Sequence, residues 1–94
     1  MLVVITDSEA MPQFERGFIE SGNRGFTVVP EILGRGKSGL RTGDRVHPGA
    51  SSLLFSVVSD AESDETLKML RSIRDRAGVA ELTKIYALPA EEVS

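Results

Sequence analysis

Two short apolar runs constrain the fold of this chain more than any other feature. Leu2–Ile5 is apolar throughout, and Leu53–Val58 is apolar except for one serine. A strand with one solvated face alternates apolar and polar residues, whereas a strand covered on both faces reads as a nearly continuous apolar run. Both segments are therefore predicted to be strands of a sheet whose two faces are covered.

The chain of 94 residues is expected to form one small domain that spans residues 1–94. Apolar runs and glycine or proline breaks predict strands at 2–5, 26–33, 51–59 and 82–88, with a helix after the first strand and another after the third. Pro30 interrupts the second strand and has no backbone N–H to donate. We therefore expect Pro30 at a sheet edge or at a bulge, with the strand continuing past it.

End signals and apolar stripes define the two helices. Pro12 suits a first helical turn and Gly22 suits a helix end, so the first helix is placed between them. Its expected buried stripe is Phe14, Phe18 and Ile19. The second helix is expected to start at a cap on Ser59 or Ser63, where acidic residues cluster, and to end at Gly78. Its expected stripe is Leu67, Leu70, Ile73 and Ala77.

The predicted order of elements, βαββαβ, is typical of the ferredoxin-like fold. This is an α+β two-layer sandwich in which an antiparallel four-stranded sheet carries both helices on one face. Two helices cover only one face, yet the runs at 2–5 and 53–58 are apolar on both. In so small a domain the simplest cover for the second face is another copy of the chain. We therefore expect a homo-oligomer.

Residues 34–50 form the one long segment without a predicted strand or helix. The segment holds five glycines and five Lys, Arg or His residues against one acid, Asp44. Glycines allow backbone N–H groups to turn toward an anion, and Arg35 and Lys37 supply positive charge beside them. Irregular segments of this length in small domains are usually either functional or disordered. If the chain binds a ligand, this segment is the first place to expect it.

Composition argues against several classes of function. The net charge is −3, which disfavours a nucleic-acid or anionic-membrane surface because phosphate contacts need clustered Lys and Arg. The sequence has no cysteine, so disulfides and thiolate metal sites are excluded. Asp7 and Glu9 follow the first apolar run, so no signal peptide or membrane span is expected there. The expected location is the cytoplasm, with no nucleic-acid partner and no membrane insertion.

Four segments of the chain resemble the PII signalling family, the nitrogen regulatory proteins. Gly25-Phe26-Thr27-Val28 is similar to the opening of that family's second strand, and Gly34–Gly39 resembles the glycine-rich base of its T-loop. Phe55–Asp60, with the acidic helix start that follows, resembles the third strand and second helix. Ile85–Pro89 resembles the closing strand. The similarity spans nearly the whole chain.

The resemblance implies a regulatory homotrimer that is not an enzyme. Members of the family pack their sheets inward, bind adenine nucleotides in clefts between subunits and dock a mobile T-loop, here at about 34–50, onto a target protein. The implied small-molecule effector is ATP, ADP or AMP, with no metal and no catalytic residue. The ligand-binding residues that the resemblance implies are Gly25, Thr27, Gly34, Arg35, Gly36, Lys37, Gly39 and Lys84.

The chain departs from the family pattern before its last strand. The family has a glycine-rich stretch there that ends in glycine-lysine and binds phosphates, whereas this chain has Ala77–Lys84 and matches only at Lys84. Glu81 places a negative charge where phosphates would lie, which disfavours their binding. The T-loop segment is also shorter, and the only tyrosine, Tyr86, lies in a predicted strand.

Two other functions fit the same fold. The main alternative is a trimeric metal-handling protein of the copper-tolerance type, but His47 is the only histidine and Asp44 is its only nearby carboxylate. An acylphosphatase-like enzyme would need an arginine after the first strand, where Thr6–Glu9 offers acids instead. Thr27 and Ser38 have no adjacent base, so nucleophilic catalysis has no support.

Overall fold

A computed structural model describes residues 1–22, 25–36, 39–41 and 50–94, with side chains for residues 1–22, 25–33 and 50–94. The strands are β1 (Leu2–Asp7), β2 (Thr27–Ile32), β3 (Gly34–Gly36), β4 (Gly39–Arg41), β5 (Ser51–Ser56) and β6 (Lys84–Ala87). The helices are α1 (Met11–Glu20) and α2 (Asp60–Ala77), and a 3-10 turn, η1, covers Ala80–Leu82. No helix in the described part of the chain has the length and apolarity that a membrane crossing requires.

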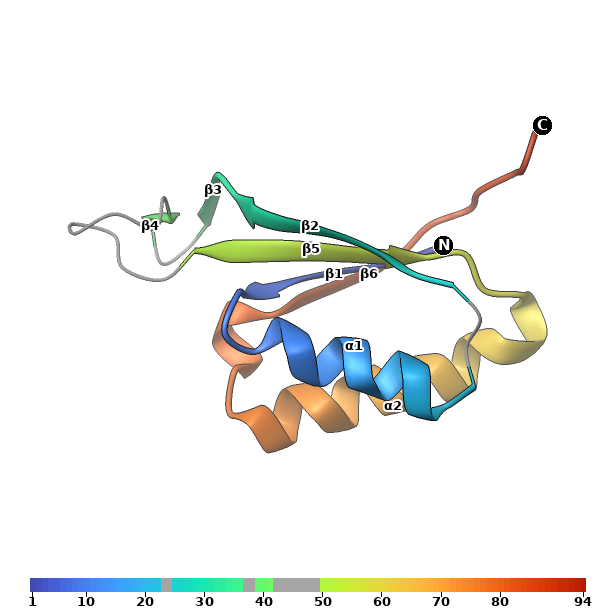
Figure 1. The fold of residues 1–94 in the computed structure, drawn as a ribbon, viewed down its shortest axis with the longest axis horizontal. Helices are drawn as coiled ribbons and strands as arrows, with labels where there is room; N and C mark the ends of the chain where they lie inside the picture. The colour runs from blue at the N-terminus through green and yellow to red at the C-terminus, as the bar shows by residue number, and fades with distance from the viewer. Residues whose placement is uncertain (23–24, 37–38, 42–49) are drawn as a thin grey trace.

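Four of the strands form one antiparallel sheet in the order β2-β5-β1-β6, so β5 and β1 are central and β2 and β6 are at the edges. Both helices lie against one face of this sheet, and no described element covers the other face (Figure 1). This is the ferredoxin-like βαββαβ arrangement, and the predicted fold class is confirmed. β3 and β4 pair with each other in a separate sheet beyond the end of the large one (Figure 1).

Helix α1 packs on the sheet through residues spaced three and four apart. Its buried residues are Met11, Phe14 and Phe18. Pro12 occupies the first turn, where a missing backbone N–H breaks no helical bond. The prediction that Ile19 shares the buried stripe is wrong, because its side chain is 66% exposed. One step along a helix rotates a residue by about 100°, so Ile19 points away from the side on which Phe18 is buried.

Helix α2 has the start and the end that the sequence predicts. The Ser59 side chain accepts the Glu62 N–H at 3.2 Å, and the Glu62 carboxylate accepts the Ser59 N–H at 3.3 Å. This reciprocal pair is a capping box, so Ser59 is the cap and Ser63 lies inside the helix. Gly78 ends the helix in the left-handed region at φ +70°, which favours glycine. The buried residues of α2 are Leu70 and Ile73.

The core lies between the helices and the face of the sheet that they cover. Its fully buried side chains are Phe14, Phe18, Leu2, Leu54, Leu70, Val4, Thr6 and Ser56. The helices approach each other closely at Gly17, where a Cβ atom would collide with Cδ1 of Ile73 and lie 3.3 Å from the Met69 sulfur. The core therefore depends on glycine at one helix crossing as well as on apolar side chains.

The prediction for Pro30 is confirmed. β2 is an edge strand, and its register against β5 shifts between Val29 and Ile32. Within this bulge Glu31 has a positive φ of +52°, a conformation that residues other than glycine rarely adopt. The strand continues to Ile32, which pairs with Ser51 at the start of β5.

The predicted end of the third strand, the predicted start of the last strand and the prediction that 34–50 has no strand are wrong. β5 ends at Ser56, and Val57 is 67% exposed. β6 begins at Lys84, because the backbone at Ala80–Leu82 turns back on itself in η1. The segment 34–50 contains β3 and β4, which pair with each other as antiparallel strands. Their glycines made this pairing hard to predict, because glycine has a low strand propensity. Lys37, Ser38 and His47, which the sequence analysis considered, lie outside the described residues.

Candidate functional site

The sheet face away from the helices, the outer face, is apolar in its centre and polar at two edge positions. Side chains alternate between the two faces of a strand, and the fully buried Val4 marks the set that faces the helices. The outer face therefore carries two cross-strand rows. They are Thr27-Phe55-Val3-Tyr86 and Val29-Leu53-Ile5-Lys84. The four side chains in the middle of these rows are half-buried, whereas Tyr86 is 54% and Val29 42% exposed.

Thr27 and Lys84, both predicted to bind a ligand, lie at opposite edges of the outer face. Both side chains are exposed. β5 and β1 lie between the two edge strands, so three strand spacings, or roughly 14 Å, separate them across the sheet. A single chain does not bring these two residues into contact.

A hollow of about 300 Å³ opens beside Thr27, where β2 begins and β5 ends. Its lining residues are Gly25, Phe26, Thr27, Phe55, Ser56 and Val57. The Ser56 hydroxyl donates a 2.6 Å hydrogen bond to the carbonyl oxygen of Gly25, which fixes the segment that enters β2 against β5. Aromatic carbon beside backbone polar groups suits a flat heteroaromatic ring. The structure thus brings the predicted residues Gly25 and Thr27 together in one concave place.

Hydroxyl groups tie together the strand ends from which residues 33–50 leave the sheet. The backbone N–H of Glu31 donates to the Ser52 hydroxyl at 3.3 Å, and that hydroxyl lies 2.7 Å from the Ser8 hydroxyl. The Ser8 N–H donates to the Ala50 carbonyl oxygen at 2.8 Å. This hydroxyl tie, formed by Ser8, Ala50, Ser52 and Glu31, joins β2, β5 and the turn after β1. Sequence reasoning missed it, although Pro30 marks the neighbouring bulge.

The predicted glycines of the basic segment lie in the small ladder of β3 and β4. The ladder pairs Gly34 with Arg41, Arg35 with Leu40, and Gly36 with Gly39. It follows the Ile32 end of β2, whereas Gly25 precedes the opposite end of that strand. The predicted residues that the structure describes therefore fall into two groups, one at the start of β2 and one at the other end of the sheet, where β6 also begins with Lys84.

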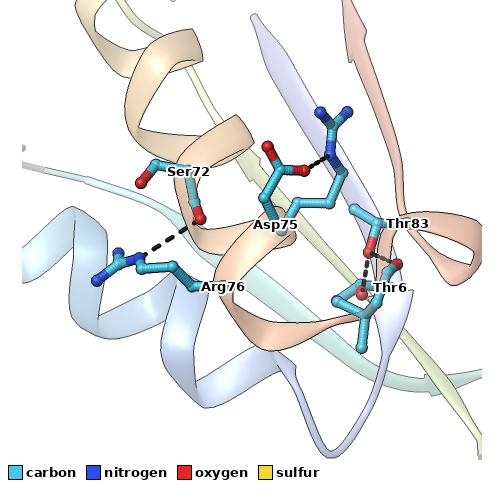
Figure 2. Close-up of polar contacts among 7 residues, drawn as sticks. Thr6, Ser72, Asp75, Arg76 and Thr83 are labelled. Carbon is cyan, nitrogen blue, oxygen red and sulfur yellow. Dashed lines mark hydrogen bonds and ion pairs between the residues drawn. The ribbon is translucent and has the colours of Figure 1, made fainter.

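The turn before Lys84 is closed by its own backbone hydrogen bonds, and Figure 2 shows the Thr83 hydroxyl beside the Thr6 hydroxyl. The backbone N–H of Leu82 donates to the Val79 carbonyl oxygen at 3.0 Å, and that of Thr83 donates to the Ala80 carbonyl oxygen at 3.4 Å. The Thr83 hydroxyl donates to the Val79 carbonyl oxygen at 2.7 Å. It therefore accepts the proton of the Thr6 hydroxyl, 2.8 Å away in β1. Thr6 and Thr83 are both buried, so the turn is fastened to the central strand.

Two further observations concern metal ions and anionic ligands. Among residues with described side chains, no three His, Asp or Glu residues are placed to hold a metal ion, and His47 lies outside that set. A second hollow, of about 420 Å³, lies between the end of α1 and the start of α2. Its lining includes Glu62 and Glu65 but none of the residues predicted to bind a ligand. Acidic lining of this kind disfavours an anionic ligand.

Comparison with known proteins gives a family and a fold. The family "Nitrogen regulatory protein P-II" matches residues 1–94. A search of curated protein sequences finds no match. Among solved structures the chain is similar to CPII, a nitrogen regulatory PII-like protein from Thiomonas intermedia K12, described as bound to ADP, AMP and bicarbonate. The two share 15% sequence identity with a TM-score of 0.67, over 90% of this chain and 80% of that chain.

Proposed function

The chain belongs to the nitrogen regulatory protein P-II family, and on that premise we propose that it is a homotrimeric regulator. In this proposal an adenine nucleotide binds between subunits, and residues 34–50 pass the ligand state to a partner protein. The outer face supplies the assembly surface. The β2 and β6 edges supply the ligand site, and the segment between β2 and β5 supplies the output.

The apolar outer face is the observation that carries this proposal. Phe55, Val3, Leu53 and Ile5 lie side by side on it and are only half-buried in one chain. Burying each of these half-buried side chains against another copy should contribute a free energy of about 1 kcal/mol. Complete burial of a fully exposed side chain of this size contributes roughly twice that amount. A ring of copies places the β2 edge of one subunit next to the β6 edge of its neighbour. Thr27 of one copy then approaches Lys84 of the next.

The hollow beside Thr27 suits the base of the ligand. Phe26 and Phe55 offer aromatic carbon, and the backbone around Gly25 offers polar groups for an adenine edge. The phosphate end then points toward Lys84 of the adjoining copy and toward β3, the strand that holds Arg35. The PII-like protein with the same fold is described with ADP, AMP and bicarbonate bound, which supports an adenine nucleotide as the ligand class here.

The hydroxyl tie supports a route from ligand to partner. The 34–50 segment connects β2 to β5, and both ends of this connection, at Glu31 and at Ala50, belong to the tie. A ligand that binds Arg35 therefore acts close to the point where hydrogen bonds hold the end of β2 to β5. The segment is basic in a chain of net charge −3, so the partner surface that it fits is acidic.

The test combines mass in solution with calorimetric titration of AMP, ADP, ATP and bicarbonate. The expected result is a trimer that binds at least one adenine nucleotide saturably. Lys84→Ala should weaken that binding about tenfold or more, because it removes the cation facing the phosphate. Arg71→Ala, which removes an exposed cation from α2, is the matched control and should bind as the parent does.

The two halves of the proposal fail separately. A monomer at all concentrations would overturn the assembly and with it the shared ligand site. A stable trimer without nucleotide binding would keep the assembly and overturn the ligand.

A further inference from the structure

The bulge in β2 determines which side chain lies on the outer face near the end of that strand. The register of β2 against β5 is regular as far as Val29 and then gains one residue, so that Pro30 and Glu31 together fill one step of the ladder. After the bulge Ile32 pairs with Ser51. Residues two apart along a strand share a face, so Ser51 belongs to the outer-face set of β5, and the residue directly opposite shares that face. Ile32 is therefore an outer-face residue.

Without the bulge the same strand would present a charge at this place. In the regular register Glu31 would pair with Ser51, one position before Ile32. The Glu31 carboxylate would then lie on the outer face, in the row that Asp7 joins through its own pairing with Ser51. One step of register thus exchanges an isoleucine for a glutamate on the outer face.

Pro30 is compatible with the regular register as well. The Ser8 N–H donates to the Ala50 carbonyl oxygen at 2.8 Å, and this pair continues the register of β1 on β5. Bonded pairs recur at every second residue of an antiparallel ladder, so the backbone groups of Ser52 bond to β1 and not to β2. A residue of β2 opposite Ser52 then has no ladder bond to make, and a proline there loses none.

The bulged register carries a backbone cost. Glu31 adopts a φ of +52° in it, which is unfavourable for a residue with a side chain. The bond that compensates is long, because the Glu31 N–H donates to the Ser52 hydroxyl at 3.3 Å. A contact from outside the chain can therefore decide the register.

We propose that assembly selects the bulged register of β2 and so fixes the end of the strand from which the 34–50 segment continues. This inference rests on the proposed function, because it takes another copy of the chain as the cover of the outer face. Covering that face buries Ile32 in the bulged register, whereas in the regular register it would bury the carboxylate of Glu31. The two registers thus differ in their affinity for another copy, and this difference shifts the chain to the bulged one.

The test exchanges the two residues and keeps the composition. Ile32→Glu alone places a charge on the outer face in the bulged register, so the concentration at which the oligomer dissociates should rise about tenfold or more. Adding Glu31→Ile should bring that concentration back to within about threefold of the parent, because the regular register then places an apolar side chain opposite Ser51. The displaced charge would take the place of Leu33, which is 70% exposed and tolerates it. Sedimentation over a dilution series measures the dissociation.

Leu33→Glu is the matched control, because it adds the same charge at the next residue, where the side chain is exposed. It should leave the dissociation unchanged. The register itself is read by nuclear magnetic resonance. Cross-strand proton contacts should join Ile32 with Ser51 in the parent, and residue 31 with Ser51 in the exchanged variant.

Three results would contradict the inference, and they are distinguishable. An exchanged variant that dissociates as readily as Ile32→Glu overturns the choice between two registers. A protein with Ile32→Glu that assembles like the parent overturns the place of Ile32 in the interface, while the proposed function stands. A parent protein that is a monomer at all concentrations overturns the proposed assembly, and the inference with it.

Discussion

At the scale of single residues, the root of the 34–50 segment is held in an unusual backbone conformation. Glu31 lies in the left-handed region, which costs a residue with a side chain about 1 kcal/mol or more. The hydrogen bond from its N–H to the buried Ser52 hydroxyl helps to hold that conformation. Pro30 predicted the bulge, but nothing in the sequence predicted that Glu31 would adopt a positive φ. Neither the composition nor the spacing of residues indicates which glutamate has a positive φ.

The first prediction concerns this hydroxyl. Ser52→Ala should lower the free energy of unfolding by about 1–2 kcal/mol, since the Glu31 N–H and the Ser8 hydroxyl lose a buried partner. Urea titration followed by circular dichroism measures the change. Ser72→Ala alters an exposed serine of α2 and should stay within about 0.5 kcal/mol of the parent. Equal stability of the two variants would contradict the role of the tie.

The second prediction concerns the basic segment. The double variant Arg35→Ala and Lys37→Ala should abolish the nucleotide-dependent thermal shift and leave the mass of the oligomer unchanged. The reason is that β3, which holds Arg35, belongs to a separate sheet beyond the end of the large one (Figure 1). Lys68→Ala with Arg71→Ala removes two exposed cations from α2 and is the control. Dissociation of the double variant in sedimentation would place the segment in the assembly interface.

At the scale of elements, local chemistry was enough to predict most of the fold. The capping box at Ser59, the glycine stop at Gly78 and the edge position of Pro30 each follow from backbone bonding needs that the sequence displays. The prediction for Ile19 was wrong because adjacent residues of a helix point about 100° apart. The residue after the buried Phe18 therefore lies outside the buried stripe. The start of β6 was misplaced because the turn at Ala80–Leu82 depends on tertiary bonds to Thr6.

The third prediction concerns the contact between the helices. Gly17→Leu should lower the free energy of unfolding by about 1–3 kcal/mol, because the new side chain enters the space of Ile73 and Met69. The same side chain introduced by Gln13→Leu, at an exposed position of α1, should be nearly neutral. The urea concentrations at the unfolding midpoints of the two variants measure this difference in stability. A neutral Gly17→Leu would mean that the helices move apart without cost.

At the scale of the whole molecule, the candidate site was predicted only in part. Gly25 and Thr27 do line a hollow, and Lys84 does lie on the outer face at the other edge. A sequence cannot show that these groups are separated by two strands within one chain. That separation is a property of strand order, and it is the reason why the proposed site needs two copies.

The fourth prediction concerns the assembly. Leu53→Glu places a charge in the middle of the outer face, so the protein should sediment as a monomer while keeping its far-ultraviolet circular dichroism. Nucleotide binding should be lost with the assembly. Ile19→Glu introduces the same charge at an exposed apolar residue of α1 and should leave the mass unchanged. A Leu53→Glu protein that remains an oligomer would show that the outer face is not the interface.

The pairing of β1 has a consequence for how the chain is made. Leu2 is synthesised before both of its strand partners, Ser56 and Ala87. β1 is apolar and lies between β5 and β6 in the sheet, so it lacks both partners until those two strands have been synthesised. Pairing between segments so distant in sequence closes long loops and slows folding. Until then the apolar residues of β1 are open to contacts with other chains, which favours aggregation over folding.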